Sequence, residues 1–322
     1  MSPELQAAVA RHLSARGAGG YRVGAAALTQ RYRAGERSDA AIDLGAYLVA
    51  RLPATFAAVK AVLCEIALRR PGFAPGGLLD VGCGPGTASW AAVETWPELR
   101  SSIFLDDHPG FLALAGQLAR GASHPALVKA KALQGDMIAL LRQQEVSDLV
   151  ICAYALAEIP EGRLTAAVES LWQAARDILV LVEPGTPAGF RRLHAARSWL
   201  LASGAVPVAP CPHGGPCPLV APDWCHFPVR LARSRAHMHA KAAAVPFEDE
   251  KFSYLAVSRH GAASGGARIV APPGDTKPGL TFKLCTEAGL ETRHVARRDR
   301  EAYKTHRKAI WGGLLGPGEG PT

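Results

Sequence analysis

The chain has 322 residues, of which 48% are hydrophobic and 20% are charged, so it has enough apolar surface for a packed core and is neither disordered nor fibrous. The 36 Lys and Arg residues exceed the 28 Asp and Glu residues and give a formal net charge of +8, which favours polyanionic partners. The sequence contains no run of about 18 apolar residues, so we expect no membrane span.

The first residues predict an amphipathic helix rather than a targeting segment. Residues 1–17 carry Glu4 early and lack the apolar run and small-residue cleavage site of a signal peptide. We therefore expect an intracellular, cytoplasmic protein, and we also expect a monomer. Disulfides are rare in such compartments, so the seven cysteines need another explanation.

Residues 1–70 are rich in Ala, Leu and Arg, and their apolar residues follow helical spacing, as in Leu44, Leu48 and Leu52. This pattern predicts an all-helical N-terminal lobe in which a helix ends or restarts at Pro53. Glycines and prolines within 71–77 predict a linker after it.

Residues 71–200 alternate between short apolar runs and longer amphipathic segments. We expect strands at 78–83, 102–106, 148–154 and 178–185, and helices at 87–95, 109–120, 137–144 and 162–176. Continuous apolar strands separated by helices are typical of a parallel sheet covered on both faces. The pattern therefore predicts a doubly wound, Rossmann-like α/β domain whose ligand lies beyond the carboxyl ends of the strands.

The first strand-to-helix turn contains Gly82, Gly84 and Gly86 in the segment DVGCGPG. Glycine permits tight turns and close approach of a ligand, and the following helix offers free N–H groups. With Asp80 just before it, this GxGxG loop resembles that of class I S-adenosylmethionine-dependent methyltransferases. The resemblance implies a methyltransferase fold in which the glycines and the acidic residue contact S-adenosylmethionine.

Two further acidic residues are candidates for the same ligand. Asp106 ends the second strand about twenty residues after the loop, where a carboxylate accepts both ribose hydroxyls, and Asp107 competes with it. In methyltransferases of this type an acid after the third strand faces the adenine amino group, which implies Asp136 in QGDM. For each acid the alternative is a helix cap or a solvated turn.

The segment ICAYALAEIP at 151–160 lacks the D/N-P-P-Y/F motif of amine methyltransferases and the Pro-Cys nucleophile of pyrimidine carbon-5 methyltransferases. Tyr154 and Glu158 are candidates to line the pocket, but the spacing identifies no catalytic base. Cofactor binding is therefore better supported than methyl transfer. Cys152 in this segment, like Cys64 and Cys83, is expected to be a buried packing residue.

Residues 201–292 form a cysteine-rich region. The stretch 204–228 holds seven prolines together with Cys211, Cys217 and Cys225, and we expect neither helix nor sheet in it. Strands are expected again at 252–259, 267–273 and 280–285. The basic tail at 293–322 is expected to fray.

The cysteine intervals of six and eight residues differ from the close pairs of most zinc sites, whereas iron–sulfur clusters accept wider spacing. A closed site needs a fourth thiolate, for which Cys285 is the candidate outside the α/β half. His213 and His226 are the alternatives, because either completes a zinc site with the three cysteines. The spacing leaves iron–sulfur and zinc both open, although a loop this long needs a clamp.

Several stretches together resemble one family. They are LLDVGCGPGTASWAA, LVEPGTPAGF, CPHGGPCPL with DWCHF, FEDEKFSYLAVSR and RDREAYKTHRKAIWG. They are similar to the methyltransferase-like proteins of the mitochondrial small ribosomal subunit and their bacterial relatives, over residues 40–315. The resemblance implies a role in translation or ribosome assembly, contact with small-subunit ribosomal RNA, and a 4Fe-4S cluster on Cys211, Cys217, Cys225 and Cys285. It also implies a mitochondrial location if the source is a eukaryote.

Basic residues in two segments fit an RNA partner, and no DNA partner is expected. Arg230, Arg233, Arg235 and Lys241 follow the third cysteine at helical spacing. The tail adds Arg293, Arg297, Arg298, Arg300, Lys304, Arg307 and Lys308. Such side chains supply phosphate contacts, and Tyr303 and Trp311 are candidates to stack on unpaired bases. For any single residue a solvated helix face is the alternative.

Three functions stay open on these residues. The first is a methyltransferase-fold protein that binds S-adenosylmethionine and a 4Fe-4S cluster, acts on the small ribosomal subunit and passes a methyl group to RNA. The second is a non-catalytic assembly factor in which cofactor and cluster stabilise an RNA-binding shape. The third is a methyltransferase for another substrate with zinc in the cysteine loop.

Overall fold

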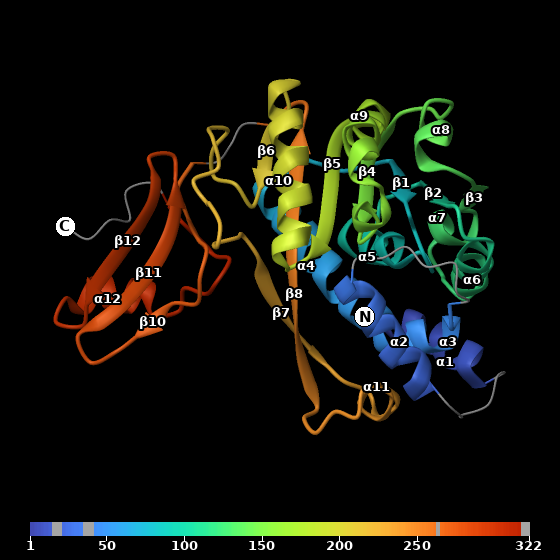
Figure 1. Cartoon of the computed structure of the whole chain (residues 1–322), viewed down its shortest axis with the longest axis horizontal. Coiled ribbons are helices and arrows are strands. Elements are labelled where there is room, and N and C mark those ends of the chain that lie inside the picture. The colour runs from blue at the N-terminus through green and yellow to red at the C-terminus, as the bar shows by residue number, and fades with distance from the viewer. Residues whose placement is uncertain (15–20, 35–41, 262–264, 317–322) are drawn as a thin grey trace.

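The computed structural model describes residues 1–14, 21–34, 42–261 and 265–316. Figure 1 shows a group of N-terminal helices, a central sheet with helices on both faces, and a smaller C-terminal sheet. The cysteine-containing segment runs between the two sheets.

The described part of residues 1–70 is helical. It forms α1 (Pro3–Ser14), α2 (Tyr21–Ala34), α3 (Leu44–Ala50) and α4 (Leu52–Arg69). Asp43 caps α3 by accepting the Ala46 N–H, and Pro53 lies in the first turn of α4, where its missing N–H costs no hydrogen bond. In the described part of the chain no single helix has the length and composition of a membrane span, although α3 and α4 together do, across a bend of 51°.

The central sheet is doubly wound, as the alternation predicts. Its strands are β1 (Gly77–Val81), β2 (Ser101–Asp106), β3 (Lys131–Gln134), β4 (Ser147–Ala153), β5 (Ala175–Pro184), β6 (Val206–Ala209), β7 (Phe227–Ala232) and β8 (Phe247–Ser258). They lie in the order β3-β2-β1-β4-β5-β8-β6, and β7 pairs with the first half of β8. The first five strands are parallel, while β8 runs antiparallel to β5 and β6. The order reverses between β1 and β4, which is where such sheets bind ligands.

Helices cover both faces of this sheet. They are α5 (Thr87–Thr95), α6 (Pro109–Ala119), α7 (Pro125–Val128), α8 (Met137–Leu141), α9 (Leu164–Ala174) and α10 (Pro187–Ala202). Alternate residues of each strand point to opposite faces: Leu78 and Val180 join the core that holds α4 and α5, whereas Leu79 and Leu179 join the core that holds α9 and α10.

Two further parts are attached to the sheet. The short helix α11 (Arg235–Ala240) connects β7 with β8, and its Ala240 packs with Ala25, Val49 and Ala50 of α2 and α3. The C-terminal sheet contains β9 (Ala267–Ile269), β10 (Gly274–Asp275), β11 (Gly279–Thr286), β12 (Gly289–Ala296) and β13 (Leu314–Leu315), with α12 (Arg300–His306) packed on it.

Three expectations from the sequence are wrong. The proline-rich stretch 204–228 contains β6 and the start of β7, because an edge strand accepts a proline that has no N–H to donate. The segment 293–315 does not fray, because it contains the end of β12 and the whole of α12 and β13. Residues 317–322 lie outside the described part. Arg230 lies on β7, so the basic residues after the third cysteine do not share one helix.

Candidate functional site

The glycine loop joins β1 to α5 with three residues in the left-handed region: Gly82, Gly84 and Gly86 have φ angles of 63°, 52° and 77°. A Cβ on Gly82 would lie 2.5 Å from the Cβ of Ala155, so the loop requires glycine there. The nearest atom to a Cβ on Gly84 is the Tyr47 hydroxyl oxygen at 3.8 Å. The loop is thus open at Gly84, beneath a tyrosine of α3 that sequence reasoning missed.

Asp80 and Asp106 both stabilise this loop. Asp80 is 1% exposed, and its carboxylate accepts the backbone N–H and the hydroxyl of Ser89 at 3.0 and 2.7 Å. Burial raises the pKa of Asp80 to about 7, although the Ser89 hydrogen bonds oppose this. The Asp106 carboxylate accepts the N–H groups of Gly84 and His108 at 2.8 and 2.9 Å. Asp106 therefore faces the loop, whereas the competing Asp107 is exposed.

Asp136 makes the contacts of a helix cap. Its carboxylate accepts the N–H groups of Ile138 and Ala139 at 3.1 Å each and pairs with Arg163 at 2.9 Å. Both side chains of this ion pair are nearly half exposed. The contact with adenine stays a prediction.

The segment after β4 carries a backbone outlier. Tyr154 has a φ of 59° and is buried, and its hydroxyl donates to Glu250 at 3.1 Å. Arg51 lies over the Tyr154 ring and pairs with Glu250 at 3.6 Å. Such a strained backbone persists when the surrounding structure holds it in place. Here Tyr154, which we expected to line the pocket, is held by its hydrogen bond to Glu250 of β8. Glu158, the other such residue, is exposed.

A second buried acid lies next to this segment, at the end of β5. Glu183 is fully buried, and its Oε1 accepts the Leu156 N–H at 2.9 Å. Its Oε2 has no hydrogen-bond partner among the described residues. Burial raises the pKa of Glu183 to about 8. No spacing rule pointed to this residue, because it lies within the apolar strand expected at 178–185.

Four cysteines that are distant in the sequence line one cavity of about 520 Å³, counting the space at its mouth: Cys211, Cys217, Cys225 and Cys285. Three come from the proline-rich segment, and Cys285 comes from β11 of the C-terminal sheet. Of the remaining cysteines, Cys83 and Cys152 are buried as expected, but Cys64 is exposed on α4, so its expected packing role is wrong.

Two arginines flank the cysteine cavity. Arg197 of α10 donates to the Cys211 Sγ at 3.3 Å and to the carbonyls of His213 and Gly215 at 3.2 and 2.7 Å. Arg268 of β9 donates to the Pro210 carbonyl and pairs with Glu65 at 2.9 Å. Sequence reasoning missed both residues, since neither belongs to a cysteine motif.

Two thiols of this cavity, those of Cys225 and Cys285, hold their protons tightly. Burial and then the neighbouring cysteines raise the pKa of Cys225 well above its usual range and that of Cys285 to about 12. A metal that bound here would have to displace protons. In the described ranges no three His, Cys, Asp or Glu residues are arranged around a point as ligands of a metal ion, so the metal centre stays a prediction.

The two histidines proposed for zinc lie in different surroundings. The His213 Nε2 is 3.5 Å from the Cys285 Sγ. His226 stacks on Trp224, with ring centroids 4.9 Å apart, and meets the edge of Trp311 at 4.8 Å. Trp311 is thus partly buried against His226, and one face of Tyr303 is covered by Arg297 at 4.6 Å.

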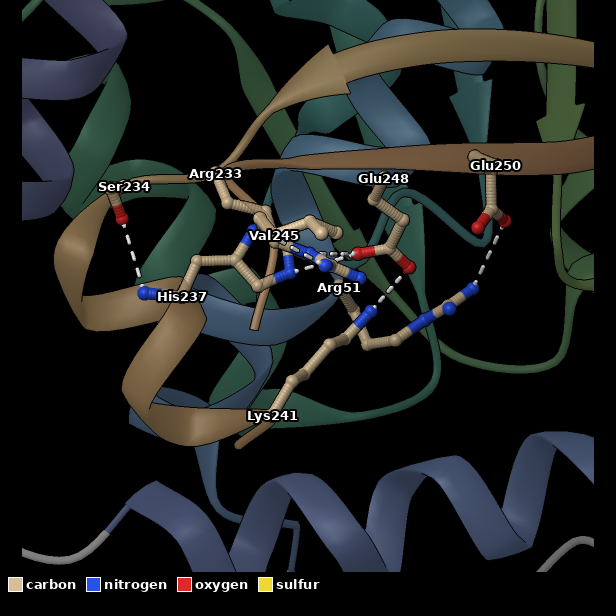
Figure 2. A network of polar contacts seen from close by, with 8 residues as sticks. All are labelled: Arg51, Arg233, Ser234, His237, Lys241, Val245, Glu248 and Glu250. Atoms are coloured by element: carbon tan, nitrogen blue, oxygen red, sulfur yellow. Dashed lines mark hydrogen bonds and ion pairs between the residues drawn. The ribbon is translucent and has the colours of Figure 1, made fainter. Parts of the chain in front are cut away.

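Most basic residues after the third cysteine are engaged internally. Figure 2 shows Glu248 of β8 contacting Arg233, His237 and Lys241 at 3.3, 3.1 and 2.6 Å. Arg230 pairs with Asp249 at 2.7 Å. The tail differs: five exposed cations make no ion pair among the described residues, and they are Arg298, Arg300, Lys304, Arg307 and Lys308.

Comparison with known proteins gives a match at residues 41–316 to the family described as mitochondrial small ribosomal subunit Rsm22. The human protein "Ribosome assembly protein METTL17, mitochondrial" is 32% identical over 292 residues, which are 84% of this chain and 61% of that protein. The Schizosaccharomyces pombe "Rsm22-cox11 tandem protein 2, mitochondrial" is 23% identical over 330 residues, which are 84% of this chain and 42% of that protein. The chain thus spans about three fifths or less of these relatives.

Two solved structures resemble part of the chain. The magnesium protoporphyrin IX methyltransferase of Synechocystis PCC 6803, with bound SAH, covers 72% of this chain and 94% of its own, with 17% identity and a TM-score of 0.44. A putative RNA methyltransferase from Pyrococcus horikoshii covers 62% of this chain and 83% of its own, with 13% identity and a TM-score of 0.41.

Proposed function

This chain belongs to the Rsm22 family of the mitochondrial small ribosomal subunit, and on that premise we propose that it acts in assembly of the small ribosomal subunit. In this proposal it binds S-adenosylmethionine at the glycine loop, carries a 4Fe-4S cluster on four cysteines and contacts ribosomal RNA. The observation that carries the proposal is the family match over residues 41–316, which includes the glycine loop and all four cysteines.

The glycine loop supports the S-adenosylmethionine part of the proposal. Gly84 leaves open space beneath Tyr47, and the Asp106 carboxylate faces the loop. Each of its oxygens accepts one backbone N–H and has a further lone pair for a ribose hydroxyl. When bound, S-adenosylmethionine supplies an electrophilic methyl group. The Tyr154 hydroxyl is engaged by Glu250, which favours a binding role, and methyl transfer to RNA is the second candidate function.

The cysteine cavity supports the cluster. Three of its thiols come from the proline-rich segment and the fourth comes from β11 of the C-terminal sheet, so a cluster bound there would cross-link these two parts of the chain. The intervals of six and eight residues between the three cysteines of the proline-rich segment favour an iron–sulfur core, with zinc as the alternative occupant.

Calorimetric titration with S-adenosylmethionine tests the glycine loop. Gly84→Arg places a long side chain in the open space and should abolish binding. Gly204→Arg is the matched control, because Gly204 also has a positive φ, of 85°, but lies in open surroundings far from the loop. Incorporation of labelled methyl groups into small-subunit particles separates the enzyme from the non-catalytic factor. Wild-type protein that does not bind S-adenosylmethionine would refute this part.

Iron and sulfide content after anaerobic purification tests the cluster. We expect brown protein with iron in the wild type, and loss of that iron in Cys217→Ser, because three thiolates leave the cluster open. Cys64→Ser, which changes an exposed cysteine outside the cavity, should keep the iron. Colourless wild-type protein with stoichiometric zinc would contradict the iron–sulfur assignment.

A further inference from the structure

Arg197 is a buried cation without an acidic partner. Its residue is 6% exposed, and in the described part of the chain no Asp or Glu pairs with it. Its guanidinium instead donates to two carbonyls and to the Cys211 sulfur. A buried charge is costly unless an opposite charge compensates it, so the surroundings of Arg197 lack one anion.

The second arginine at the cavity, Arg268, differs from Arg197 because it has an acidic partner. Arg268 is 2% exposed and pairs directly with Glu65 of α4 at 2.9 Å. Its charge is therefore compensated within the protein. Both arginines line the same cavity, and it is the unpaired one that points its Nε–H at a cysteine sulfur.

We propose that Arg197 is the counterion of an anionic cluster held by the four cysteines, and that its hydrogen bond to the Cys211 sulfur sets the reduction potential of that cluster. This inference rests on the cluster in the proposed function. An oxidised 4Fe-4S core with four thiolates is a net anion, and one added electron makes it more negative. A neighbouring cation and an N–H···S hydrogen bond stabilise the reduced form more than the oxidised form, which raises the potential.

Arg197 also positions the ligand loop. Its second nitrogen donor bridges the carbonyls of His213 and Gly215, so one side chain on a rigid helix orients the turn that carries Cys211. The side chain is thus a positioning residue, and a test has to separate its charge from its role in holding the loop.

The experiment compares the full-length chain with three variants, purified anaerobically. A dithionite titration supplies the electron, and electron paramagnetic resonance follows the reduced cluster. Arg197→Met should lower the ratio of reduced to oxidised cluster at a given potential about tenfold, which corresponds to a midpoint about 59 mV more negative for a one-electron couple. Arg197→Lys keeps the cation and should recover most of the shift. Arg192→Met is the control, because Arg192 lies on the same helix and donates to two carbonyls, of Leu156 and Ile159, away from the cavity.

Each outcome decides between the two proposals. Equal midpoints for cluster-loaded wild type and Arg197→Met overturn the counterion role and leave the cluster standing. Iron-free wild type overturns the cluster and the counterion role together. If Arg197→Met holds no iron, Arg197→Gln replaces it, since Gln keeps an N–H donor without charge. A midpoint for Arg197→Gln equal to that of Arg197→Lys then overturns the counterion role.

Discussion

Glu183 is an acid that the fold keeps protonated. It ends β5 next to the turn after β4, and burial raises the pKa of its carboxyl from 4.5 to about 8. Since the folded-state pKa lies above the unfolded one, the protonated group contributes full stability below about pH 4.5 and loses it as the pH rises through 8. Glu183 thus accepts the Leu156 N–H, but its effect on the free energy of unfolding becomes less favourable as the pH rises.

Glu183→Gln should therefore stabilise the protein at alkaline pH. The amide keeps an acceptor for Leu156 and cannot ionise, so the free energy of unfolding should exceed that of the wild type by about 4 kcal/mol at pH 8 and differ little at pH 4.5. Urea unfolding at both pH values measures this. The exposed Glu161→Gln should show no such pH dependence, and an equal gain at both pH values would contradict the burial argument.

The β7–α11–β8 segment, which we call the arm, connects the N-terminal helices with the central sheet. Its α11 packs on α2 and α3, and Glu250 of β8 pairs with Arg51 between α3 and α4. Within the segment, Glu248 lies among three cations (Figure 2). Burial alone would raise the pKa of Glu248, but hydrogen bonds from His237 and Lys241 outweigh it and lower the pKa to about 2. This ion cluster gives the arm its shape.

Glu248→Gln should loosen the arm in a pH-dependent way. Because the folded-state pKa is depressed, the carboxylate contributes stability above about pH 4.5 and loses it as the pH falls towards 2. We expect a loss of about 2 kcal/mol at pH 7 that shrinks over this window, with faster hydrogen exchange in α11 and α3.

The neighbouring Asp249→Asn is the matched control for that variant. Asp249 lies on the same strand, but its pair with Arg230 is exposed, and such pairs contribute at most about 1 kcal/mol. Loss of equal size in both variants would show that the ion cluster around Glu248 has no special role.

At the scale of the whole molecule, the cations of the arm and those near α12 differ in whether they form ion pairs. The arm uses Arg230, Arg233 and Lys241 in internal ion pairs, whereas exposed cations on and after α12 have no acidic partner among the described residues. The C-terminal part of the chain therefore carries a group of exposed cations that are available for phosphate contacts.

Removing two of these cations should weaken RNA binding in a salt-dependent way. In Arg307→Ala with Lys308→Ala, the slope of log affinity against log salt for small-subunit RNA should fall by about 1 to 2, because up to two counterion-releasing contacts are lost. Fluorescence anisotropy at several KCl concentrations measures the slope. Arg230→Ala, which removes a cation already paired with Asp249, should leave it unchanged. An unchanged slope in the double variant would locate the RNA surface elsewhere.

Local patterns determined most of the central sheet. The strands ending at Asp106 and Ala153 and the helix Thr87–Thr95 follow from apolar runs and a glycine turn, because hydrophobic periodicity and backbone freedom are properties of neighbouring residues. The strand β3 was missed because it is short and mostly exposed, and β6 was missed because the prolines in and around it predicted a loop. The sequence also did not predict the ion pairs that Arg230, Arg233 and Lys241 form.

The sequence by itself determined the doubly wound fold and the glycine loop, and it singled out four cysteines as a group. Only the tertiary structure decided that Cys285 of β11 meets the proline-rich segment, that Glu183 is buried, and that Arg197 has a sulfur but no carboxylate beside it. The physical reason is that spacing along the chain governs secondary structure, whereas charge burial and ligand convergence depend on which distant segments pack together.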